Sequence, residues 1–169
     1  GWGGGSQYST GVTTVGTPGS AGAYTEITIP VGAPTLYYYC TNHSGMGGTI
    51  YTIDTVYTVT VASGTNPYGT GNKFYLNGSV SPTISLAEGG TFRFDQSDSS
   101  NSTHPLRFST TPNGTHAGGG ATEYTTGVTT AGTPGSSGAY TEITVASGAP
   151  TLYYYCTNHS GMGGQADTP

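Results

Sequence analysis

Residues 151–164 read Thr-Leu-Tyr-Tyr-Tyr-Cys-Thr-Asn-His-Ser-Gly-Met-Gly-Gly, and this stretch decides the fold. Its first part, residues 151–156, is predicted to be a β-strand, in which successive side chains point to opposite faces. Leu152, Tyr154 and Cys156 share the face that we expect to point into the core. Tyr153 and Tyr155 take the other face, where they would form sheet surface or an outward contact patch. Cys156 is therefore expected at the inner end of a core strand, away from water.

The loop after this strand carries potential metal ligands in the spacing Cys-x2-His-x2-Met, namely Cys156, His159 and Met162. Its glycines permit the backbone bends that bring three side chains around one point. Thiolate and thioether are soft ligands that suit Cu(I), and imidazole also binds copper. The second imidazole must come from elsewhere, and His104, which lies between two predicted strands, is the natural donor. His116 is expected to be a solvated loop residue.

The rest of the chain shows the period-two alternation of β-strands, and no helical periodicity of useful length appears. Strands are predicted over residues 56–63, 73–77, 83–87, 91–96, 106–109, 140–145 and 151–156. Seven strands in about 115 residues is the density of a β-sandwich, so the predicted fold class is all-β. The seven residues after Met162 are predicted to be a poor, curtailed strand that ends in proline.

An internal repeat organises the chain. Residues 8–48 and 124–164 align without a gap at an offset of 116, and 35 of the 41 aligned positions are identical. A period this long indicates tandem domains rather than solenoid units. Residues 1–54 are therefore predicted to be the C-terminal half of one module, and residues 55–169 a second module with a curtailed last strand.

The first copy repeats three of the ligands as Cys40, His43 and Met46, which predicts a partial second metal site without a counterpart of His104. A half-sandwich cannot close its own core. Residues 1–54 are therefore expected to be part of a longer repeat protein, or to be completed by another chain in a fibre or oligomer. A disulfide between Cys40 and Cys156 is a remaining alternative, which their equivalent positions in the repeat argue against.

Composition narrows the possible functions. Charged residues make up 7% of the chain, and a net charge of -5 with only three basic residues argues against nucleic-acid binding. No apolar run approaches the roughly 20 residues of a membrane span, and no signal peptide is visible. The abundance of Gly, Thr, Ser and Tyr is typical of extracellular and virion-surface β proteins. No nucleophile motif such as Gly-x-Ser-x-Gly occurs, so no enzyme activity is predicted.

A loop histidine far upstream, followed by Cys-x2-His-x2-Met after a Tyr-rich strand, resembles the cupredoxins, the type 1 blue copper proteins. The ligand loop has the short, amicyanin-like spacing. The resemblance covers about residues 55–164 and implies a Greek-key sandwich with His104, Cys156 and His159 as equatorial copper ligands and Met162 as the axial one. Several cupredoxins have Asn where Pro105 follows His104 here, which leaves the tether between the two ligand loops open. More loosely, the tandem modules resemble cupredoxin-like repeats in predicted structural proteins of marine bacteriophages.

Several readings of the site stay open at the level of sequence. The chain is expected to be an extracellular or virion-surface structural or adhesive protein, such as a fibre or filament, in which copper stabilises the fold. Electron transfer through the exposed edge of His159 is the alternative, and copper sequestration is a third. Zinc is an alternative metal, although thioethers such as Met162 are poor zinc ligands. The ligands could also persist only as packing, with Cys156 as a small buried apolar residue.

Overall fold

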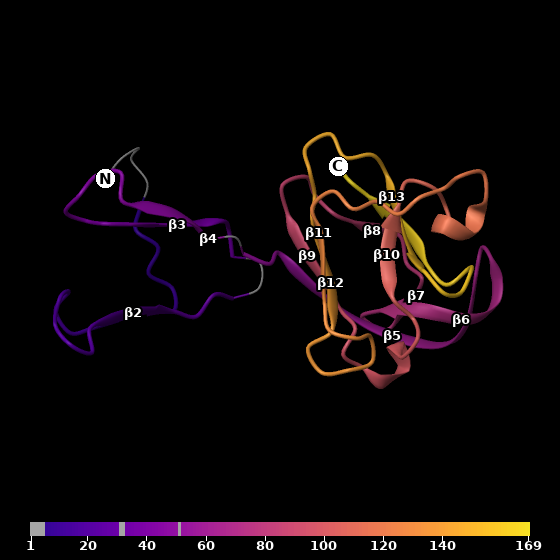
Figure 1. Ribbon diagram of the computed structural model, residues 1–169, viewed down its shortest axis with the longest axis horizontal. Helices are drawn as coiled ribbons and strands as arrows, with labels where there is room; N and C mark the ends of the chain where they lie inside the picture. The colour runs from indigo at the N-terminus through magenta and orange to yellow at the C-terminus, as the bar shows by residue number, and fades with distance from the viewer. Residues whose placement is uncertain (1–5, 31–32, 51) are drawn as a thin grey trace. The chain divides into compact units, whose positions relative to one another are not determined.

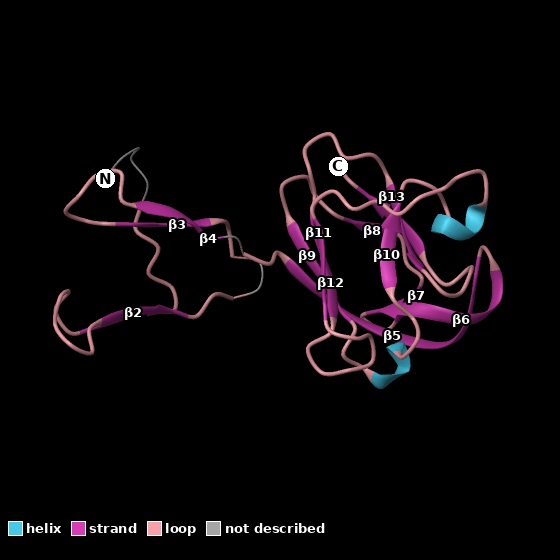
Figure 2. Ribbon diagram, in the orientation of Figure 1, coloured by secondary structure: helices cyan, strands magenta, loops and turns pink. Residues whose placement is uncertain are grey.

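The computed structural model describes residues 6–30, 33–50 and 52–169. Over these residues the chain is almost entirely β, as predicted, and its helical structure is limited to two short 3-10 turns, η1 (Ser99–Asn101) and η2 (Gly114–Ala117) (Figure 2). The chain divides into two compact units, unit 1 (residues 1–54) and unit 2 (residues 55–169). Among the described residues, no helix is long and apolar enough to cross a lipid bilayer.

Unit 2 is built from two sheets (Figure 1). The four-stranded sheet contains, in spatial order, β10 (Leu106–Ser109), β13 (Leu152–Cys156), β14 (Gly164–Asp167) and β8 (Ile84–Ser85). The six-stranded sheet contains, in spatial order, β11 (Val128–Ala131), β12 (Tyr140–Thr144), β9 (Thr91–Asp95), β5 (Thr55–Asn66), β6 (Gly69–Leu76) and β7 (Ser79–Val80). The pairs β5–β9 and β14–β8 are parallel and the other pairs are antiparallel.

One hydrophobic core joins the two sheets. The six-stranded sheet contributes Phe74 and Phe94, and the four-stranded sheet contributes Phe108, Leu152 and Tyr154. The alternation expected from the sequence holds, because Phe94 and Leu152 are fully buried. An all-β sandwich is therefore confirmed, and the Greek-key cupredoxin topology stays a prediction.

The last strand corrects the expectation of a curtailed strand. Residues Gly164–Asp167 form β14, which pairs antiparallel with β13 and parallel with β8. Ala166 is fully buried in the core. Pro169 lies beyond the strand, so its missing N–H removes no hydrogen bond from the ladder. Composition alone underestimated this segment because its partners on both sides come from elsewhere in the chain.

Tyr155 corrects a second expectation. It points to the face of β13 opposite Cys156, as predicted, yet it is 1% exposed because the turn η2 covers it. Gly114 in η2 lies so close to the Tyr155 ring that a Cβ there would collide with it. Tyr153 is half-buried. The predicted outward contact patch is therefore wrong for Tyr155.

Unit 1 consists of two hairpin-like strand pairs among its described residues. β1 (Val12–Val15) pairs with β2 (Tyr24–Ile27), and β3 (Leu36–Tyr39) pairs with β4 (Gly47–Ile50). These registers repeat those of β11–β12 and β13–β14 at the same offset of 116 residues; for example, Leu36 lies opposite Ile50 as Leu152 lies opposite Ala166. The sequence repeat is thus also a repeat of strand pairing.

Candidate metal centre

Three of the four predicted ligands of unit 2 come together. The ligand atoms of His104, Cys156 and His159 all lie within 4.8 Å of one another. Cys156 Sγ is 3.8 Å from His104 Nδ1 and 3.7 Å from His159 Nδ1. A sulfur about 2.3 Å and a nitrogen about 2.0 Å from one ion lie about 3.5–3.7 Å apart in tetrahedral or trigonal geometry. The spacing of the three side chains therefore fits a single metal ion.

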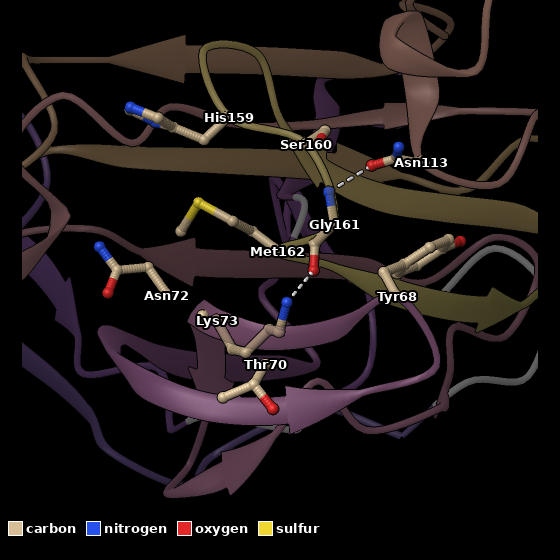
Figure 3. Close-up of a pocket in the computed structure, with 10 residues that line it drawn as sticks. Tyr68, Thr70, Asn72, Lys73, Asn113, His159, Ser160, Gly161 and Met162 are labelled. Carbon is tan, nitrogen blue, oxygen red and sulfur yellow. Dashed lines mark hydrogen bonds between the residues drawn. The ribbon is translucent and has the colours of Figure 1, made fainter.

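Met162 lies next to this cluster. It is 1% exposed and lines the same cavity as His159. Figure 3 shows its side chain extending on the side of the loop from which His159 projects. A buried thioether thus shares a cavity with His159, one of the two imidazoles of the cluster.

The position of His104 is set by a buried side chain that sequence reasoning missed. Gln96 is 1% exposed, and it bonds the backbone on both sides of Pro105. Its Nε2 donates to the carbonyl of His104 at 2.8 Å, and its Oε1 accepts from Leu106 N at 3.0 Å. The available signal was the alternation of the preceding strand, which points Gln96 inward together with Phe94. An inward glutamine needs buried polar partners, and here these are the backbone groups that flank the proline.

The two ligand loops are tethered directly. Asn158 Nδ2 donates to the carbonyl of Thr103 at 2.9 Å, and Thr157 N donates to the carbonyl of Pro105 at 3.1 Å. The tether that the proline left open therefore comes from the loop that carries Cys156. It joins Thr103 and Pro105, the neighbours of His104, to Asn158, the neighbour of His159, and to Thr157, the neighbour of Cys156.

The backbone around Met162 is held by hydrogen bonds from distant parts of unit 2. The carbonyl of Gly161 accepts from Lys73 Nζ at 2.7 Å, and Gly161 N donates to Asn113 Oδ1 at 2.6 Å (Figure 3). The same carbonyl also accepts from Asn66 Nδ2 at 3.0 Å. The carbonyl of Met162 accepts from two further donors, Phe74 N and Ser81 Oγ. The ligand loop is therefore held in place by hydrogen bonds from several other segments of unit 2.

Burial shifts the proton affinity of two ligands. It raises the pKa of the Cys156 thiol, which the backbone N–H groups of Asn158 and His159 partly oppose. Burial also lowers the pKa of His104, and the charge that His159 can carry lowers it further. Both shifts favour the uncharged form, which is the thiol for Cys156 and the neutral imidazole for His104. Metal binding as a thiolate complex must release the thiol proton.

His116 is not the solvated loop residue that the sequence suggested. It is half-buried, and its Nε2 lies 2.9 Å from the backbone carbonyl oxygen of Cys156. Its ring also meets Tyr155 edge-on at a centroid distance of 6.3 Å. His116 therefore supports the backbone of a ligand rather than facing solvent.

The partial site of unit 1 brings two of its three predicted ligands together. Cys40 Sγ lies 3.4 Å from His43 Nδ1. Met46 is 58% exposed, and within the described part of unit 1 no further His, Cys, Asp or Glu joins the pair to form a three-ligand cluster. Cys40 and Cys156 are both free thiols.

Comparison with known proteins finds no matching family model, no matching curated protein and no matching solved structure.

Proposed function

We propose that unit 2 is a copper-binding module with a type 1 site, in which His104, Cys156, His159 and Met162 would hold the ion. The convergence of one thiol and two imidazoles within 4.8 Å carries this proposal. The buried thioether of Met162 favours copper over zinc, because thioethers suit Cu(I) and are poor zinc ligands. When bound, copper supplies one-electron redox chemistry.

We further propose that the module belongs to an extracellular or virion-surface protein with a structural or adhesive role. The near-identical repeat and the low charge of the chain support this proposal. A metal that binds only the folded module stabilises it, by about 2.7 kcal/mol when free copper is 100 times its dissociation constant. In this role copper would link the segment that carries His104 to the loop that carries the other ligands.

Electron transfer is the second candidate function, and the exposure pattern of the ligands favours it. His159 is exposed, whereas Cys156 and His104 are buried. An imidazole edge at the surface offers electrons a route between a buried site and a partner. The hydrogen bonds that hold the backbone of Gly161 and Met162 would also limit rearrangement of the ligand loop when the oxidation state changes.

Copper titration tests the site. Adding Cu(II) to the reduced, metal-free protein should produce an intense blue thiolate-to-copper absorption. Cys156→Ser should abolish the colour, and Cys40→Ser, the matched change in the partial site, should leave it intact. A colourless wild-type titration, or colour that survives Cys156→Ser, would refute the assignment.

The two roles are separated by stability and redox measurements on the same samples. If copper leaves the melting temperature unchanged, the structural role is refuted. If voltammetry finds no reversible potential, the carrier role is refuted.

A further inference from the structure

The same sequence is buried in unit 2 and exposed in unit 1. The strand and ligand loop are identical in the two copies over Leu36–Gly48 and Leu152–Gly164. Three equivalent pairs show the contrast in exposed fraction: Tyr38 at 61% against Tyr154 at 1%, Tyr39 at 54% against Tyr155 at 1%, and Met46 at 58% against Met162 at 1%. In unit 1, Tyr38, Tyr39 and Met46 therefore form an exposed surface, which we call the bare face. In unit 2 the equivalent side chains are covered by other segments of the sandwich.

The strand pairing in unit 2 identifies the segment that covers the equivalent surface. In unit 2, β12 pairs with β9, β13 pairs with β10, and β14 pairs with β8. Within the described part of the chain, the equivalent strands β2, β3 and β4 pair only inside unit 1, β2 with β1 and β3 with β4. All three absent neighbours, β8, β9 and β10, lie within residues 55–123 of unit 2. Unpaired edges are templates for strand addition.

Side-chain and backbone contacts give the same answer. Tyr154 donates its hydroxyl to the carbonyl of Pro82 at 2.7 Å, and the carbonyl of Met162 accepts from Phe74 N at 2.9 Å. Both partners again lie within residues 55–123. Tyr154 and Met162, which make these two contacts, have identical counterparts in unit 1, namely Tyr38 and Met46. The bare face of unit 1 thus carries the chemistry that recognises this segment.

We propose that unit 1 is a docking surface for a further β half-module with the strand pattern of residues 55–123. A second copy of residues 1–169 has no free half-module of this kind to offer. It holds one such half-module, and its own residues 124–169 already pack on it. The docked half-module would add strands equivalent to β9 and β10 to the edges of β2 and β3. Its contacts would bury Tyr38, Tyr39 and Met46.

Docking also completes a second metal site. Cys40 and His43 already lie within ligand distance of each other, and the missing imidazole is the counterpart of His104 that the half-module carries. This clause rests on the proposed copper function. The docking itself does not, because its strand and tyrosine contacts involve no metal.

A tandem chain tests the proposal, with a copy of residues 55–116 placed ahead of Gly1 so that the repeat offset is kept. Without metal, amide hydrogen exchange at Tyr37–Tyr39 should slow by at least about 100-fold relative to the unmodified chain. With copper, the tandem chain should bind two ions where the unmodified chain binds one. Unchanged exchange at Tyr37–Tyr39 would overturn the proposal.

Two variants of the added segment separate docking from metal binding. The change equivalent to Phe94→Asp, which places a charge in the core, should abolish the protection. The change equivalent to His104→Ala should keep the protection and lose the second copper, and protection without any copper binding would refute only the metal function. If the unmodified chain dimerises and Tyr37–Tyr39 become protected, a second copy is the partner and the assignment to a half-module is wrong.

Discussion

Gln96 offers the sharpest test of how the fold positions the metal ligands. Gln96→Leu keeps the side chain close in size but removes the partners of two buried backbone groups, the carbonyl of His104 and the N–H of Leu106. Each unsatisfied group costs about 1–3 kcal/mol, and burial of the aliphatic side chain offsets about 1–2 kcal/mol. Two unsatisfied groups less this offset leave a mid-range loss of about 2.5 kcal/mol in the free energy of unfolding.

Urea unfolding of the metal-free protein, followed by circular dichroism, measures this loss. With a urea dependence of about 2 kcal/mol per molar, the midpoint should fall by about 1.3 M. The matched control is Gln165→Leu on β14. The Gln165 side chain is half-buried and donates to Asp167, so this variant should change stability by no more than about 1 kcal/mol. Equal midpoints for the two variants would refute the role of Gln96. Copper affinity should also fall at least about tenfold in Gln96→Leu, because His104 loses an anchor.

Three further outcomes follow from the contacts around the site. Asn158→Ala removes the tether to Thr103 and should lower copper affinity by about threefold to tenfold in a competition titration. The control Asn72→Ala changes a residue that lines the same cavity as His159, and it should leave copper affinity unchanged. Gly163→Ala should lower the melting temperature by an amount equivalent to about 1–3 kcal/mol, since its Cβ would collide with the carbonyl oxygen of Tyr154; an unchanged melting temperature would contradict the packing. Burial raises the pKa of Tyr57 in the folded protein, so the stability that its neutral phenol contributes is complete below pH 10, the usual pKa of tyrosine, and is lost as the pH rises through the higher pKa of the folded state. Urea titrations between pH 9 and 12 should therefore show a smaller loss of stability for Tyr57→Phe than for the wild type.

The strands and the ligand loop were predictable because their signals are local. Alternation of side chains placed Leu152, Tyr154 and Cys156 on the core face, and all three are buried. The spacing of Cys156 and His159 within one loop likewise indicated that they meet. Gln96, by contrast, was visible only as an inward polar residue, because its partners depend on how Pro105 is accommodated.

Contacts between distant segments were not predictable from the same patterns. Lys73 reaches the carbonyl of Gly161 across 88 residues of sequence, and η2 covers Tyr155, which alternation had placed on an open face. β14 forms because β13 and β8 flank it, although its own composition is poor for a strand. In each case the deciding partner is brought near only by the packing of the two sheets.

The two copies of the repeat show most directly what each level determines. The sequence alone determines strand pairing within each copy, because both copies adopt the same registers through short-range hydrogen bonding. Only the tertiary structure decides whether the shared tyrosines and methionine are buried, since Tyr154 has a covering sheet and Tyr38 does not. It also decides where a three-ligand cluster forms, because His104 must approach Cys156 from 52 residues away. Pairing is a property of neighbouring strands, whereas burial and metal ligation need a second surface that the strand pair does not contain.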